Sequence, residues 1–327
     1  MGLYTRGLLS TSVFKVKTSQ SLDQLSEVIA GDRYPSDPDK AARGWGSLSD
    51  DDYFTMKESI AAKYSGIAPR TEFNQNESRV LRARYYYDRV NPALAKRFGD
   101  GDDWKLYHER HAFDVLLIDE GQPDEVTALV SSRRQDEVYD VAKPALLALL
   151  QDEAPPGQVD SASITEELDA DFFLWLLYRL DGGGHVHAGL SISEIMAINS
   201  KNLLGRSRFN DGAGPDRPDM MVLVAGGSGQ FGPAKVALTH TKAPPGYFEL
   251  ELHQDAGFVV LRDSSYDDED LADMPKEELG RRMVEDVWQV VLPTLRFAYK
   301  DDTDWFDTER DAFKARCKSS VVSVLSR

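Results

Sequence analysis

The first clear element of the chain is an alternation of side chains with a period of two. Over Thr11–Thr18, Phe14 and Val16 alternate with lysines, which is the pattern of a β-strand with one buried face. Ser21 then occupies the position of a helix N-cap, before an apolar stripe that runs to Ile29. The opening of the chain therefore predicts a strand followed by a helix.

The rest of the N-terminal half mixes both periodicities. The pattern predicts a helix after Ser49, a helix over Asn76–Phe98 interrupted at Pro92, strands over Phe113–Ile118 and Val126–Ser131, and a helix over Gln135–Leu150 despite Pro144. Strands and helices in this order are typical of a small mixed layer.

The C-terminal half reads as one helix, a series of strands and two closing helices. The apolar helix Leu168–Leu180 ends at three consecutive glycines, Gly182–Gly184. Strands are predicted over His185–Ile192, Glu194–Asn199, Met220–Ala225, Ala234–His240, Tyr247–His253 and Phe258–Arg262, and helices over Lys276–Lys300 and Thr303–Leu325. Turn-rich loops between the later strands indicate an antiparallel meander.

A stretch rich in proline and small polar residues, Gln151–Thr165, separates the two halves. We predict two domains, residues 1–153 and 163–327, joined by this linker. The fold class is α+β: an N-terminal mixed helix/strand domain followed by an antiparallel β-meander flanked by helices.

The register of one hairpin can be estimated from its apolar positions. If residues 242–246 form the turn, His240 pairs with Phe248, and Leu238 pairs with Leu250. This register places every apolar side chain on one face and predicts that His240 is a packed core residue, with His253 on the polar face.

Composition limits the classes of function. The chain has 327 residues, and its acidic side chains outnumber its basic ones for a formal charge of −17. A polyanion such as DNA is repelled by this balance unless one face is locally basic or the salt is high. The acidity is compatible with a halophilic origin or with an acidic surface on a mesophilic protein, and both readings stay open.

Cellular location is read from apolar runs and cysteine usage. The longest strongly apolar run, Phe172–Tyr178, is far shorter than the roughly 20 residues of a membrane span. The first residues lack the apolar run of a secretory signal. A single cysteine, Cys317, leaves no internal disulfide and no Cys-rich zinc site. We expect a cytoplasmic protein that does not associate with membranes.

Two groups of residues are weak candidates for metal ligands. His185 and His187 fall on one side of a predicted strand, and Glu249, Glu251 and His253 form a polar row on another. They support an alternative function as a metal-dependent hydrolase or nuclease. An exposed loop edge and a solvated sheet face explain the same residues more simply.

Other catalytic patterns are incomplete. His108 and His111 are three residues apart, whereas a zincin helix needs four, and the glycine-rich segment 226–235 lacks the Lys-Ser/Thr end of a phosphate loop. Val126–Ser131 offers no Glu-x-Lys pair for a nuclease, and no Gly-x-Ser-x-Gly elbow occurs. We predict no catalytic residue and no cofactor.

One segment carries the opposite charge to the rest of the protein. The segment from Arg70 to Gly99 contains seven basic residues and only three acidic ones. If this segment is helical, one face carries Arg79, Arg82, Tyr86 and Arg89, with Arg133 and Arg134 able to join the same surface. Arginine suits bidentate phosphate contacts, and tyrosine can stack on a base. Pairing of these arginines with the abundant acids is the competing interpretation.

The sequence therefore favours a non-enzymatic recognition or accessory subunit that binds nucleic acid or an acidic protein partner through this Arg/Tyr face. The metal-dependent hydrolase is the first alternative. A structural subunit of a homo- or hetero-oligomer, with an interface on the helices of residues 276–325, is the second.

Overall fold

The computed structural model describes most of the chain and divides it into two compact units. The described residues are 8–35, 39–46, 71–99, 103–151, 156–161, 168–187, 189–202, 205–210, 212–214, 216–226, 230–242, 245–272 and 274–326. The first unit contains residues 10–162 and the second contains residues 163–327, with short N-terminal segments shared between them. The helix predicted after Ser49 lies outside the described residues.

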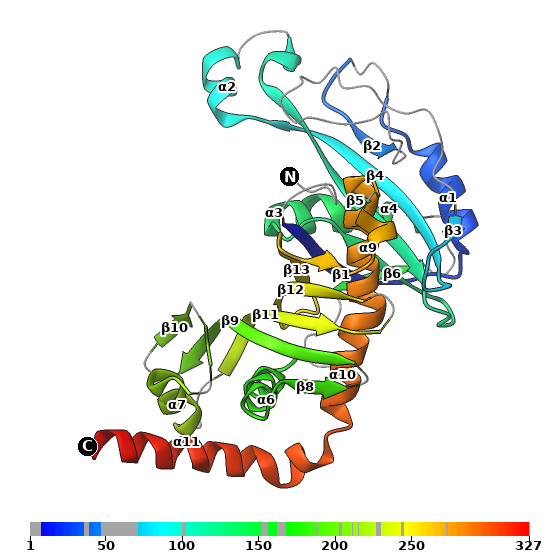
Figure 1. The fold of residues 1–327 in the computed structure, drawn as a ribbon. Helices are drawn as coiled ribbons and strands as arrows, with labels where there is room; N and C mark the ends of the chain where they lie inside the picture. The colour runs from blue at the N-terminus through cyan, green and yellow to red at the C-terminus, as the bar shows by residue number, and fades with distance from the viewer. Residues whose placement is uncertain are drawn as a thin grey trace. The chain divides into compact units, whose positions relative to one another are not determined.

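The first unit is built mainly of strands (Figure 1). Its elements are β1 (Leu9–Lys17), α1 (Leu22–Gly31), β2 (Arg43–Gly46), β3 (Thr71–Phe73), β4 (Arg79–Val90), α2 (Pro92–Phe98), the 3-10 turn η1 (Trp104–Leu106), β5 (His108–Asp119), β6 (Glu125–Val130), α3 (Gln135–Glu137), the π-helical turn η2 (Val138–Ala142), α4 (Lys143–Ala148) and β7 (Gln158–Ser161). The strands form an antiparallel sheet in the order β1-β6-β5-β4-β2, with β7 on β1 and β3 on β4.

Helix α1 shows how the sequence determines local structure in this unit. Ser21 accepts a hydrogen bond from the backbone N–H of Gln24, whose side chain accepts from the backbone N–H of Ser21, which completes a capping box. Leu22, Leu25 and Ile29 are buried on its inner face. Burial of each such side chain contributes roughly 1.5–3 kcal/mol, so the helix is held mainly by its packing against the sheet.

Residues 79–90 form a strand, so the helix predicted over Asn76–Phe98 is wrong for most of its length. The pairing of β4 with β5 is continuous from Arg79 opposite Asp119 to Val90 opposite His108, and the two strands run side by side in Figure 1. Only α2 is helical, with Asn91 as its N-cap. The Arg-rich element of the N-terminal domain is therefore a β-strand.

The second unit contains an antiparallel sheet and several helices. Its elements are α6 (Ala170–Asp181), β8 (His185–His187), β9 (Leu190–Asn202), β10 (Gly205–Phe209), α7 (Pro218–Ala225), β11 (Gln230–His240), β12 (Gly246–Leu252), β13 (Phe258–Val260), β14 (Ser265–Tyr266), α8 (Glu269–Ala272), α9 (Lys276–Asp286), the π-helical turn η3 (Val287–Val291), α10 (Leu292–Lys300), the π-helical turn η4 (Trp305–Glu309) and α11 (Arg310–Leu325). The strand order is β10-β9-β11-β12-β13, with β8 on β9 and β14 on β12. The α+β class and the antiparallel meander flanked by helices are thus confirmed.

The register of the β11–β12 hairpin differs from the predicted one by two residues. His240 pairs with Gly246, and Leu238 pairs with Phe248, so the connecting segment, residues 241–245, has the predicted five residues but begins one residue earlier. A shift of two residues leaves each side chain on its predicted face, because side chains alternate with a period of two. His240 is accordingly buried, as predicted.

Residues Met220–Ala225 belong to helix α7 and not to the predicted strand. Met220 and Val224, four residues apart, are its buried positions, and α7 packs against α11. Pro218 at the start of the helix fits the first turn, where no N–H donor is needed. A short apolar run does not distinguish a strand from a buried helix by itself.

Two predicted helices continue through a proline, and both do so beside a π-helical turn. Pro144 follows η2 in the helix of residues 135–148, and Pro293 follows η3 in the helix of residues 276–300. Proline lacks an N–H donor and clashes with the carbonyl four residues earlier, and a wider turn relieves this clash.

Among the described residues, no helix is long and apolar enough to cross a membrane.

Candidate functional site

The predicted Arg/Tyr face does not form a single surface. Side chains of a strand alternate between two faces, so Arg79 and Arg89 project on one side of β4 while Arg82 and Tyr86 project on the other. Tyr86 is also buried. The helical spacing of these four residues therefore has no counterpart in the structure.

The arginines of β4 are paired with carboxylates at the surface of the first unit. Arg79 contacts Asp23 at 2.7 Å, Arg82 contacts Glu72 at 2.8 Å, and Arg89 contacts Asp136 at 2.6 Å. Arg134 shares the Asp136 carboxylate at 2.9 Å, and Arg133 donates to the backbone carbonyl of Thr11. A polyanion would have to compete with these acids for each guanidinium.

The weak metal-ligand candidates do not gather into a site. His185 and His187 are exposed on β8, where the His187 ring packs against Phe297. Glu251 lies between Lys235 and His253, at 3.5 Å and 3.6 Å. Across the described part of the chain, no group of three or more His, Cys, Asp or Glu side chains could hold a metal ion.

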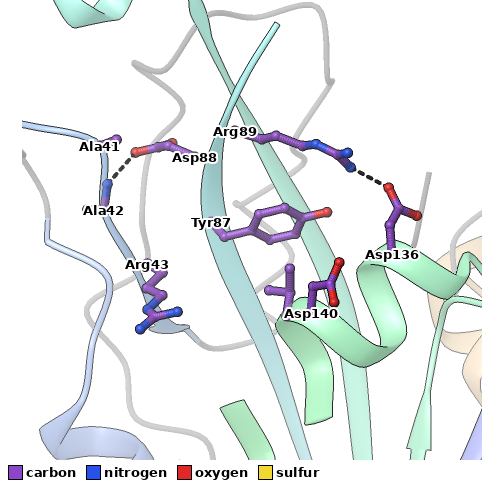
Figure 2. A pocket seen from close by; sticks show the side chains of 9 residues that line it. Ala41, Ala42, Arg43, Tyr87, Asp88, Arg89, Asp136 and Asp140 are labelled. Atoms are coloured by element: carbon purple, nitrogen blue, oxygen red, sulfur yellow. Dashed lines mark hydrogen bonds and ion pairs between the residues drawn. The ribbon is translucent and has the colours of Figure 1, made fainter. Parts of the chain in front are cut away.

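A cavity of about 400 Å³ opens on the first unit (Figure 2). Its walls come from the segment before β2, from β4, and from the helix of residues 135–148. The lining residues are Ala41, Ala42, Arg43, Tyr87, Asp88, Arg89, Asp136, Asp140 and Val141. Asp140 and Val141 belong to the π-helical turn η2, a type of irregularity that is frequent at functional sites.

The Tyr87 ring is a rigid part of this cavity because both its face and its hydroxyl are held. The hydroxyl donates to Glu137 Oε1 at 2.5 Å, and Ser132 donates to the other oxygen of the same buried carboxylate at 2.5 Å. The His111 ring stacks on Tyr87 with centroids 5.4 Å apart. Burial, reinforced by the Glu137 carboxylate, raises the pKa of Tyr87 above its usual value, so the phenol stays protonated.

Most of the charges that line the cavity are already engaged. Asp136 accepts hydrogen bonds from Arg89 and from Arg134, and these two bonds, that of Arg89 most strongly, lower the pKa of its carboxyl to about 2. Asp88 accepts hydrogen bonds from the Tyr34 hydroxyl and from the backbone N–H of Ala42. Arg43 and Asp140 make no such contact with any described residue.

A second pocket, of about 470 Å³, lies on the second unit at the strands β9, β10 and β11. Its lining is polar and contains two cations, Lys201 and Arg208, but no carboxylate among the described residues. The described lining residues are Asn199, Ser200, Lys201, Ser207, Arg208, Gln230, Gly232, Pro233 and Gln254. Neither Lys201 nor Arg208 forms an ion pair with a described residue.

The backbone of this pocket is irregular where β9 meets β11. The register shifts between Phe231 and Ala234, and Gly232 has a φ of 103°, a conformation that favours glycine. A Cβ added to Gly232 would lie 2.5 Å from the ring of Phe173 in α6. The strand can therefore approach the helix closely only with glycine here.

Ser200 also lines this pocket, but its side chain projects to the face of β9 opposite to Asn199 and Lys201, the face of the buried Phe231. The residue is 3 % exposed, and its Oγ has no hydrogen-bond partner among the described residues. A buried polar atom without a partner is uncommon in folded proteins and costs about 1–3 kcal/mol.

Sequence reasoning missed this pocket, although a signal for it exists. Lys201, Arg206 and Arg208 are three cations without an intervening acid, in a chain of net charge −17. The pocket also needs Gln230 and Gln254, which only the tertiary structure brings to the same place. Comparison with known proteins adds no assignment, since neither a family model nor a curated protein matches the chain.

Proposed function

We propose that this protein is a non-enzymatic recognition protein that binds a phosphate-bearing ligand in the pocket of the second unit. The observation that carries the proposal is the charge of that pocket: two cations and no carboxylate among its described lining residues, in a strongly acidic chain. Unpaired cations create a local positive potential that reaches about one Debye length, roughly 8 Å at physiological salt.

The chemistry of the lining supports a phosphate group over a simple carboxylate. Arg208 offers a fork of N–H donors that matches two phosphate oxygens, and Lys201 adds a point charge. The amides of Asn199 and Gln254 supply neutral donors. A tetrahedral oxyanion accepts more hydrogen bonds than a carboxylate and uses more of these groups.

The proposed class of function is the one expected from the sequence, but the proposed binding site is the pocket of the second unit and not the arginines of β4. The arginines of β4 have carboxylate partners, whereas Lys201 and Arg208 have none among the described residues. Nucleic acid is the macromolecular form of a phosphate-bearing ligand and is therefore included as a probe.

The test is a binding titration of the full chain with inorganic phosphate, ATP and a fluorescent single-stranded oligothymidylate. Lys201→Glu with Arg208→Glu removes both cations. Each lost charge-assisted contact costs about 2 kcal/mol, roughly 30-fold in affinity. The matched control is Lys242→Glu with Lys300→Glu, which makes the same change in net charge at exposed positions of the same unit.

The expected result is binding of at least one probe that the pocket variant loses and the control variant retains. Binding of ATP and oligonucleotide, compared per phosphate, separates a small-molecule ligand from nucleic acid. If no probe binds, or if both variants weaken binding equally, the pocket is not a phosphate site and the proposal fails.

A further inference from the structure

The cavity of the first unit presents one cation and one anion that lack partners among the described residues. Arg43, at the start of β2, and Asp140, in the turn η2, line opposite sides of the cavity in Figure 2. Both side chains are exposed. The other charged groups of the wall are engaged: Arg89 with Asp136, and Asp88 with the Tyr34 hydroxyl.

Between these two charges the wall is largely apolar. Ala41, Ala42 and Val141 line it, and the Tyr87 ring projects between Arg43 and Asp140 in Figure 2. The ring is fixed by the hydrogen bond to Glu137 and by the stacked His111. Tyr87 is 5 % exposed, and its fixed position reduces the entropy lost when a ligand binds beside it.

The distribution of charge selects the kind of ligand. A purely anionic ligand that reaches Arg43 also meets the carboxylates of Asp136 and Asp140. A purely cationic ligand that reaches Asp140 also meets Arg43 and Arg89. A molecule with one charge of each sign satisfies both groups, with its carboxylate on the Arg43 fork and its ammonium on Asp140.

We infer that this cavity binds a small zwitterionic ligand of the amino-acid class. A volume of about 400 Å³ lies within the range of small-molecule pockets, which is roughly 300–1,000 Å³. Ala41, Ala42 and Val141 offer an apolar surface for the side chain of such a ligand. This site is independent of the phosphate pocket, which lies in the other unit.

The first experiment screens the full chain against the twenty common L-amino acids by saturation-transfer NMR, followed by calorimetry of the strongest binder. That amino acid is then compared with its amide and with its N-acetyl derivative, each of which lacks one charge. We expect each derivative to bind about tenfold more weakly or worse.

Variants assign the two contacts. Arg43→Gln and Asp140→Asn should each weaken binding about tenfold or more, and the amide should lose its disadvantage in Arg43→Gln because the carboxylate contact is gone. Lys96→Gln on α2 and Glu27→Gln on α1 are exposed control changes of the same charge. Lys201→Glu with Arg208→Glu should leave amino-acid binding unchanged, which separates this site from the proposed phosphate pocket.

Hydrogen exchange gives a second readout that does not depend on the variants. Binding should slow exchange in residues 39–46 and 135–148, which form two of the three walls of the cavity. Absence of binding across the panel, equal affinity for the amide and acetyl derivatives, or unchanged affinity in both cavity variants would each overturn the inference.

Discussion

The buried ion pair between Arg84 and Asp114 allows the sharpest prediction about stability. The two residues face each other directly across β4 and β5, with 2.7 Å between Arg84 Nε and Asp114 Oδ1 and 3.5 Å between the second pair of atoms. Their side chains are only 5 % and 1 % exposed. Burial by itself lowers the pKa of Arg84, but the Asp114 carboxylate outweighs this effect and raises the pKa above its usual value.

Arg84→Met removes one partner and leaves a buried carboxylate without its cation. We expect a loss of about 3–5 kcal/mol in the free energy of unfolding. Arg84→Met combined with Asp114→Leu removes both charges, and it should be markedly less destabilising than the single change because no uncompensated charge remains. Arg134→Met is the exposed control, since its ion pair with Asp136 is about half exposed and should contribute little to stability.

The measurement is urea unfolding of the full chain, combined with hydrogen exchange of peptides from β4 and β5. Local exchange is needed because the chain has two units and a single transition cannot be assumed. A destabilisation by Arg84→Met no larger than that by Arg134→Met, or a double variant as unstable as the single one, would contradict the strong coupling expected for this buried pair.

Three further predictions concern the helix cap, the glycine of the polar pocket and the partly buried His111. Ser21→Ala removes the side-chain half of the capping box with Gln24 and should lower stability by about 1 kcal/mol, seen as a lower urea midpoint; no change would mean that packing alone holds the helix. Gly232→Ala places a Cβ 2.5 Å from the ring of Phe173 at a residue whose φ is 103°, so we expect a clear loss of stability in thermal unfolding. An unchanged melting temperature would contradict this geometry. Burial, only partly opposed by nearby acids, lowers the pKa of His111 below its usual value of 6.5, and an NMR titration of the imidazole should show this. The free energy of unfolding should then fall as the pH drops below about 6.5, because the unfolded chain binds the proton more readily than the folded one.

Elements with a single buried face were predictable from the sequence. The alternation around Phe14 and Val16 gives β1, and the spacing after Ser21 gives α1 with the expected cap. In both elements the polar side faces solvent, so the periodicity is visible in the residues. The α+β class follows from the order of such elements.

Elements buried on both faces were not predictable in the same way. β4 carries Leu81, Ala83 and Tyr85 on one face and the buried Val80, Arg84 and Tyr86 on the other, so polarity does not alternate along it. Its arginines happen to fall at helical spacing, and that spacing was misleading. α7 is the converse case, a short apolar run that tertiary packing makes helical.

For the candidate sites, too, some features follow from the sequence and others only from the tertiary structure. The sequence by itself determined the net charge, the capped helix, the faces of the hairpin and the supply of cations, because these depend on residue identity and on neighbours close in the chain. Only the tertiary structure decided which charges are neutralised: Arg79, Arg82 and Arg89 meet acids 56, 10 and 47 residues away, while Lys201 and Arg208 meet none that the structure describes. An ion pair forms over a few ångströms of space, and the distance along the chain between its partners does not limit it.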